Sequence, residues 1–380
     1  MLPYGRQSID EDDVAAVVGA LRSDWLTTGP AVTAFEAAVS ARVGGGAVVS
    51  VTSGTAALHT AYAAAAIGPG DEVVTTPLTF VATAATAVLQ GATVVFADVE
   101  PDTGNMDVAA ARAAITPRTR VIAPVDYAGL PAEPERFATL AAEHGLLYLA
   151  DAAHSIGSAW SGLPVGAFAD LTTLSFFPTK NVTTGEGGAV VTADADLERR
   201  ARRFHNHGLV RERADQRWPN EGGWHQEVHE FGLNYRLPDV LAALGTSQLR
   251  RLDTFKARRA QIHARYDAGL AEVDGIRTPA HRPEADPMWH LYPLRVLDGR
   301  RREVYDALRA AGIGAQVNYL PAHWHPVFAD LGYRRGQCPN AEEYYRQEIS
   351  LPLFTDLTND DVDRVVEVVR GALSGGRAQS

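Results

Sequence analysis

The stretch from Asp151 to Gly188 constrains the fold of this chain more than any other. It opens where an apolar, strand-like run, residues 146–150, meets the carboxylate of Asp151. A second apolar run, residues 171–177, is followed by Lys180 and then by a glycine-rich turn. Ligands of α/β sheets bind beyond the carboxyl ends of the strands, and both polar side chains follow such ends. The stretch therefore predicts an α/β fold with a site at that edge of its sheet.

An acid and a lysine in these places suit the chemistry of pyridoxal phosphate (PLP). A lysine amine holds the PLP aldehyde as a Schiff base, and an aspartate pairs with the ring nitrogen so that the ring can accept electrons. Each residue alone has a plainer interpretation, because a lysine after a strand is usually solvated and an aspartate there is often a helix N-cap. The choice between these interpretations depends on the residues that lie between Asp151 and Lys180.

Three ordered motifs contain or flank the two residues. They read DAAH at residues 151–154 with Gly157, SF at residues 175–176 with Lys180, and TTGEGG at residues 183–188. In this order they resemble the signature of the DegT–StrS group of nucleotide-sugar aminotransferases, and the resemblance covers residues 4–373. It implies a PLP-dependent transferase of fold type I, similar to aspartate aminotransferase. A large PLP domain with a seven-stranded, mainly parallel sheet would span residues 1–250, and a small C-terminal α/β domain residues 251–380.

Composition narrows the class of partner. The 380 residues include 46 acidic and 35 basic side chains, and the formal net charge of −11 argues against nucleic-acid binding. PLP carries a phosphate, so any positive field that attracts it must come from groups at the site and not from the net charge of the chain. The single cysteine, Cys338, excludes an internal disulfide and fits a reducing compartment. We expect no signal peptide and no membrane-spanning segment, and hence a cytoplasmic protein.

A turn of small residues offers a place for the cofactor phosphate. Residues 47–51 read as a strand, and Ser53, Gly54 and Thr55 precede an alanine-rich helix. Backbone N–H groups and the helix dipole favour an anion at such a turn, although Ser or Thr there is also a common plain cap. The family resemblance implies that this turn binds the PLP phosphate together with Ser175.

The resemblance assigns further residues around the ring and the substrate. Phe80 would stack on the pyridine ring, His154 would lie beside its 3′ oxygen, and Asp151 would keep its nitrogen protonated. The implied substrate contacts are Tyr4, Trp25, Leu26, Thr27, Asn318 and Tyr319. The turn with Trp25 could equally be a simple entry to the domain. No metal is expected, because His323 and His325 lack a third ligand nearby.

A polar stretch at residues 210–229 shows little periodicity. A structureless loop of this length is usually functional, and we expect it to cross a dimer interface or to close over the substrate. The segment that follows, residues 232–237, resembles the G-x-N-(Y/F)-R-(L/M) motif of the group. In that group the asparagine reaches the cofactor phosphate of the other subunit, which assigns this role to Asn234 and implies a homodimer with shared sites.

The resemblance implies a ping-pong reaction in which L-glutamate aminates PLP and the cofactor then aminates a nucleotide-linked keto-sugar. His154 and the runs at residues 125–129, 189–192 and 349–353 look closest to the branch that aminates C4 of 4-keto-6-deoxy-hexosamines, which includes the pseudaminic-acid pathway enzyme. The runs at residues 175–180 and 184–185 depart from that branch. Amination at C3, or of another keto-sugar or keto-cyclitol, stays open. A non-catalytic regulator with this fold would need a basic or helix-turn-helix extension. A degenerate homologue would be expected to have lost Lys180 or Asp151, and both are present.

Overall fold

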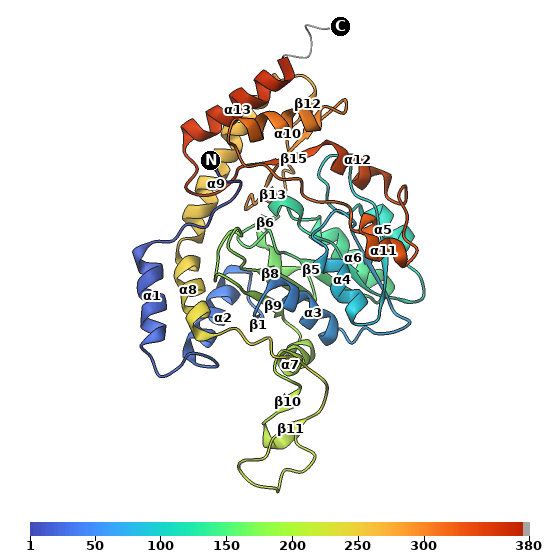
Figure 1. Cartoon of the computed structure of the whole chain (residues 1–380). Coiled ribbons are helices and arrows are strands. Elements are labelled where there is room, and N and C mark those ends of the chain that lie inside the picture. The colour runs from blue at the N-terminus through green and yellow to red at the C-terminus, as the bar shows by residue number, and fades with distance from the viewer. Residues whose placement is uncertain (375–380) are drawn as a thin grey trace.

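A seven-stranded mixed sheet forms the centre of the computed structural model, which describes residues 1–374 (Figure 1). In spatial order its strands are β1 (Ala47–Val51), β9 (Gly188–Thr192), β8 (Leu171–Ser175), β5 (Leu147–Asp151), β4 (Thr119–Ala123), β2 (Glu72–Thr75) and β3 (Thr93–Phe96). Strand β9 is antiparallel to both of its neighbours, and the other pairs are parallel. The predicted seven-stranded, mainly parallel sheet is confirmed.

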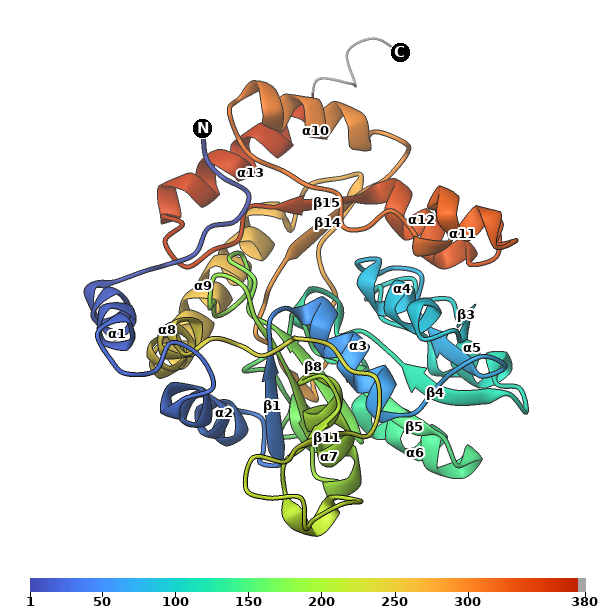
Figure 2. The same cartoon turned by 60° about the horizontal axis from the view of Figure 1, so that its bottom comes forward.

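Both faces of this sheet are buried, because successive residues of each strand are apolar and point to opposite faces. In β4, Val121 and Ala123 belong to one core and Ile122 to the other. The first face is covered by α3 (Gly54–Ala64), α4 (Ala82–Leu89) and α7 (Ala195–Phe204). The second face is covered by α2 (Pro30–Arg42), α5 (Val108–Ala114) and α6 (Pro134–His144). Figure 2 shows α4 and α6 on opposite sides of β4 and β5.

The C-terminal part has a sheet and a core of its own. Strands β12 (Ile276–Arg277), β14 (Tyr292–Val296) and β15 (Glu348–Leu351) pair antiparallel. They pack against α9 (Leu252–Leu270), α10 (Arg301–Ala310) and α13 (Asn359–Ser374). The start of the chain joins this core, because Leu2 pairs with Ile313. The division at residue 250 falls between α8 (Asp239–Arg250) and α9, and it stays a prediction.

The remaining elements are short or lie at the edges. A small sheet of β13 (Ala285–Asp286), β6 (Ala159–Trp160) and β7 (Leu163–Pro164) links the two parts. The other α-helices of the described residues are α1 (Glu11–Leu21), α11 (Pro326–Asp330) and α12 (Pro339–Gln347), and four short 3-10 helices lie in the connections. The cap of α1 is Asp10, which forms a capping box with Asp13. Between residues 1 and 374, none of the helices combines the length and the apolarity that a membrane crossing requires.

Residues 209–228 form an arm that projects from the body beyond α7 (Figure 1). Our prediction of a structureless loop is wrong here, because β10 (Leu209–Val210) pairs with β11 (Glu227–Val228). The buried carboxylate of Glu227 accepts hydrogen bonds from the backbone amides of Arg217 (2.8 Å) and Trp218 (2.7 Å). It also bonds the rings of His225 and His229, at 3.1 and 2.5 Å. The arm is therefore folded by its own polar contacts.

Candidate active site

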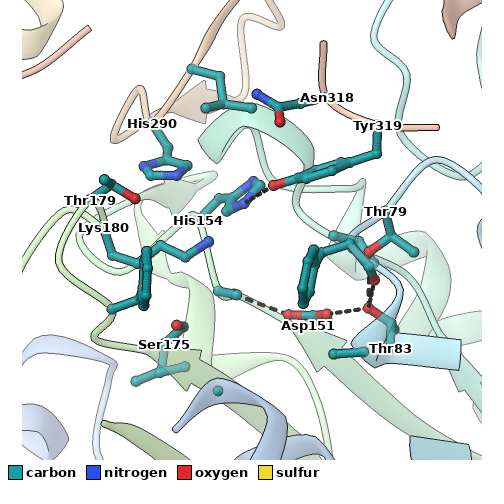
Figure 3. Close-up of a pocket in the computed structure, with 18 of the residues that line it drawn as sticks. Thr79, Thr83, Asp151, His154, Ser175, Thr179, Lys180, His290, Asn318 and Tyr319 are labelled. Carbon is teal, nitrogen blue, oxygen red and sulfur yellow. Dashed lines mark hydrogen bonds between the residues drawn. The ribbon is translucent and has the colours of Figure 1, made fainter. Parts of the chain in front are cut away.

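A cavity of about 490 Å³ opens where the carboxyl ends of β5 and β8 face the C-terminal part. Distant segments of the chain meet there, and Figure 3 shows the side chains pointing into it. The residues lining it that sequence analysis had assigned are Tyr4, Ser53, Gly54, Thr55, Phe80, Asp151, His154, Ser175, Lys180, Asn318 and Tyr319. The structure thus brings eleven predicted residues to one place.

Asp151 ends β5 and forms the acidic wall of the cavity. Its carboxylate accepts a hydrogen bond from Thr83 Oγ1 at 2.7 Å and one from the amide of Ala153 at 3.2 Å. Thr83 is in turn 2.9 Å from the hydroxyl of Thr79 (Figure 3). Burial raises the pKa of Asp151, and the hydrogen bonds and Lys180 oppose this shift. A cationic ring bound beside it would favour the ionised carboxylate.

Lys180 projects its amine into the same cavity from the turn after β8 (Figure 3). The turn is closed by a hydrogen bond of 2.9 Å from the amide of Lys180 to the carbonyl of Phe177. Desolvation lowers the pKa of this amine to about 8, although the charge of Asp151 acts in the opposite direction. A nucleophilic amine must be neutral to react, and the lowered pKa increases the neutral fraction of Lys180 near physiological pH.

The amino end of α3 forms a cradle for an anion. The hydroxyl of Ser53 accepts a hydrogen bond from the amide of Ala56 at 3.0 Å, so this side chain caps the helix. Gly54 and Thr55 leave their amides at the first turn, and a Cβ at Gly54 would lie 2.9 Å from Oγ of Ser175. Only glycine lets the helix end approach Ser175 this closely. The resulting space, flanked by amides and a hydroxyl, suits a phosphate.

Two histidines form a second wall. The rings of His154 and His290 have their centroids 4.3 Å apart and are tilted by 37° to each other, and His154 Nε2 is 3.2 Å from the hydroxyl of Tyr319. The side chain of Asn181 contacts both residues: its Nδ2 donates a hydrogen bond to the carbonyl of His154, and its Oδ1 is 3.2 Å from His290 Nδ1. Burial lowers the pKa of both rings well below the usual value. His154 Nδ1 is buried with no partner in the described chain, which fits a polar atom of a bound ring.

The mouth of the cavity is aromatic. Phe80 is 58% exposed and lies edge-on to Tyr319, with centroids 6.2 Å apart. The side-chain amide of Asn318 donates to the hydroxyl of Tyr4 at 2.7 Å. Behind them, the buried carboxyl of Glu348 accepts a hydrogen bond of 2.7 Å from the backbone amide of Asn318. A flat ring that enters the cavity would therefore contact Phe80 and Tyr319 at the mouth and polar side chains such as Asp151 deeper inside.

Four predicted residues do not line this cavity. Trp25, Leu26 and Thr27 are exposed beside the start of α8, where the amide of Asp239 donates to the carbonyl of Leu26. Asn234 is exposed and pairs with Asn206, although the next residue bonds Thr52 at the entry to α3. Their roles in binding stay predictions, and within one chain they lie outside the pocket.

Several contacts of the site were not predicted from the sequence. Thr79 and Thr83 lie in the same segment as Phe80, but no pattern indicated that a hydroxyl would reach Asp151. His290 follows Trp289 in what reads as an ordinary strand, and Glu348 is the first residue of β15, where no motif marks it. The pair of His323 and Glu342, 2.9 Å apart and buried, is a structural contact remote from the cavity.

A buried acid, a lysine of lowered pKa and a phosphate cradle at the carboxyl edge of an α/β sheet define a PLP-dependent enzyme of fold type I. The residues present fit the cofactor, and the unpartnered His154 Nδ1 and the open cradle at Gly54 lie where polar groups of PLP would be expected.

The chain belongs to the DegT/DnrJ/EryC1/StrS aminotransferase family, whose model matches residues 7–370. The spore coat polysaccharide biosynthesis protein SpsC of Bacillus subtilis is 40% identical to it, with 98% of this chain and 97% of that protein covered. The putative sugar aminotransferase Spr1654 of Streptococcus pneumoniae has been solved in PMP and PLP forms. Its PMP form superposes with a TM-score of 0.93 at 30% identity, with 99% of this chain and 100% of that chain covered. PseC of Helicobacter pylori, from pseudaminic acid biosynthesis, has a TM-score of 0.92, at 31% identity and 98% and 99% coverage. The chain is thus a PLP-dependent sugar aminotransferase.

Proposed function

We propose that this enzyme moves an amino group from L-glutamate to the C4 keto group of a nucleotide-linked 4-keto-6-deoxy sugar by a ping-pong reaction. The observation that carries this proposal is the meeting of Lys180, Asp151 and His154 around one cavity. The similarity to PseC supports the sugar class. The reaction would take place in the cytoplasm, where the buried thiol of Cys338 would stay reduced.

Each residue has one task in this proposal. PLP, when bound, supplies an aldehyde and an electron-accepting ring. Asp151, oriented by Thr83, would keep the ring nitrogen protonated. Lys180 would bond the cofactor and then carry the proton to and from the carbon that loses or gains the amine. Gly54, Thr55 and Ser175 would bind the phosphate.

The proposed substrates are anionic, and one chain offers little positive charge at the cavity. Among residues 1–374, Lys180 is the one lysine or arginine that lines the cavity, and it is engaged by the cofactor. The arm carries exposed Arg211, Arg213 and Arg217 together with Trp218 and Trp224, which are 61% and 82% exposed. Exposed tryptophans beside arginines are typical of interfaces. We therefore propose a homodimer in which the arm and Asn234 of each chain complete the site of the other.

Mixed dimers test the sharing of sites. Lys180→Ala inactivates its own site, and Asn234→Ala should weaken phosphate binding at the other chain's site, by about 1.5–3 kcal/mol for a charge-assisted hydrogen bond. In a mixed dimer one site then receives both lesions and the other receives neither. Reassembly of the two variants at limiting PLP should give more activity than the mean of the separate preparations. Verified mixed dimers without this gain would show that Asn234 acts within its own chain or not at all.

The sugar position is tested with pairs of nucleotide-linked 3-keto and 4-keto sugars. The enzyme loaded with amine by L-glutamate should aminate 4-keto-6-deoxy substrates, and NMR of the product should place the new amine at C4. Preferential turnover of a 3-keto sugar would replace this assignment by amination at C3. Turnover of neither, with an intact glutamate half-reaction, would point to a keto-cyclitol or another keto-sugar.

A further inference from the structure

A second group of polar side chains lies in the C-terminal part, outside the cofactor cavity. His263 and Asp267 are one turn apart on α9, and His281 comes from the loop between β12 and β13. His263 Nδ1 and His281 Nε2 lie 3.1 and 3.0 Å from Oδ2 of Asp267, and all three atoms are within 4.8 Å of one another. We propose that these side chains bind a divalent transition-metal ion of the zinc class.

The donor set and its spacing suit such an ion. Two imidazole nitrogens and one carboxylate oxygen are common ligands of zinc, at about 2.0–2.2 Å from the metal. Ligand atoms of a tetrahedral site at that radius are about 3.4 Å apart. The two distances to Asp267 are a few tenths of an ångström shorter, and the two ring nitrogens lie within 4.8 Å of each other. Rotation of the exposed His281 side chain would bring the three atoms to the spacing that an ion requires. His281 is 60% exposed, and water can occupy the fourth position.

The ligands are held in place before any ion binds. The ring of His263 is buried and stacks on Trp289, with centroids 3.9 Å apart and planes at 18°. The other carboxylate oxygen of Asp267 accepts a hydrogen bond of 2.8 Å from the hydroxyl of Tyr292. Such outer contacts orient metal ligands and are part of most metal sites. Only His281, on the loop, is left to adjust.

The hydrogen bonds within the cluster also permit coordination. In the absence of an ion, Asp267 accepts hydrogen bonds from both rings, and an ion would take the place of these two bonds. A metal-bound imidazole carries its proton on the nitrogen that does not bind the metal. For His263 this nitrogen is Nε2, which makes no contact in the described chain that would oppose that tautomer.

The expected role of the ion is to fasten a loop. It would tie the segment that carries His281 to α9, next to Trp289. Trp289 directly precedes His290, which lines the cofactor cavity. The ion would therefore stabilise the C-terminal part close to the cavity wall without touching the reacting atoms.

Titration of the metal-free holoenzyme with Co²⁺ and Zn²⁺ tests the site. Co²⁺ should give visible d–d bands and quench the fluorescence of Trp289, and Trp289→Phe should lose that share of the quenching. Equilibrium dialysis should show one Zn²⁺ that is bound at least tenfold more weakly by both Asp267→Asn and His281→Ala. Asp267→Asn keeps the shape of the side chain, and His281 is exposed, so both variants should fold.

A matched control separates this site from incidental binding to surface histidines. His144→Ala, which removes an exposed histidine at the end of α6, should bind Zn²⁺ as the wild type does. Equal Zn²⁺ affinity in the wild type, Asp267→Asn and His281→Ala would overturn the proposal. Failure of the wild type to bind Zn²⁺ at millimolar concentration would overturn it as well. Neither result depends on the sugar or on turnover.

Discussion

The lowered pKa of Lys180 sets the pH range in which the enzyme can attach PLP covalently. Only the neutral amine attacks the aldehyde. With a pKa of about 8, roughly one tenth of the amine is neutral at pH 7, whereas an ordinary lysine at 10.5 would be neutral in about three molecules of ten thousand. Burial therefore raises the reactive fraction about 300-fold.

The assay is rapid mixing of apoenzyme with limiting PLP, followed by the absorbance of the bound cofactor. The rate of covalent attachment should rise about tenfold per pH unit below pH 8 and level off above it. Lys180→Ala should bind PLP without the absorbance of the covalent form, which confirms that the signal reports this residue.

Asp151→Asn separates the two causes of the shift. Burial lowers the pKa of Lys180, and the charge of Asp151 partly restores it, so the variant should reach its plateau at a lower pH than the wild type. The titrations of free PLP are common to both proteins and cancel in the comparison. A midpoint near pH 10 in the wild type, or a higher midpoint in the variant, would refute the reasoning.

Three further predictions concern the contacts behind the site. Thr83→Val removes the hydroxyl bonded to Asp151 and should lower kcat about tenfold at saturating PLP, whereas Thr86→Val, which loses only a bond within α4, should not. Gly54→Ala should weaken PLP binding at least tenfold in a fluorescence titration, because its Cβ would meet Ser175, while Gly19→Ala, with no neighbour in contact, should leave it unchanged. Burial raises the pKa of Glu348 from 4.5 to about 8, so its contribution to stability is present below pH 4.5 and is lost as pH rises through 8. In urea unfolding at fixed PLP, the free energy of unfolding of Glu348→Gln should increase relative to that of the wild type by up to about 1.4 kcal/mol per pH unit between pH 4.5 and 8. A difference in unfolding free energy that does not change with pH would contradict the assignment.

The parts of the site that depend on local chain order could be predicted from the sequence. Asp151 and Lys180 follow strands directly, so their place at the carboxyl edge of the sheet follows from the strand pattern. The hydroxyl of Ser53 shows the limit of this reasoning. A serine before a helix can bind a phosphate or cap the helix, and only the bond to Ala56 shows that it caps.

The side-chain contacts that support the site and the arm could not be predicted from the sequence. Nothing in the spacing of Thr83 and Asp151 indicates that their side chains meet. The arm has the composition of an irregular loop, and its fold depends on the four bonds to Glu227, which composition does not reveal. Thr83 lies outside the local window around Asp151 in which periodicity can be judged. The partners of Glu227 lie within ten residues of it but follow no periodic pattern.

The bond between Tyr4 and Asn318 has a consequence for the order of folding. These residues are 314 positions apart in the chain, yet both line the cofactor cavity. On a ribosome the N-terminal residues emerge first, and Tyr4 must wait until Asn318 has been synthesised before it can take its place. The central sheet, complete by residue 192, can form earlier. We therefore expect a nascent chain to build the wall with Asp151 and Lys180 well before the mouth of the cavity closes, so that full retention of PLP is acquired late in synthesis.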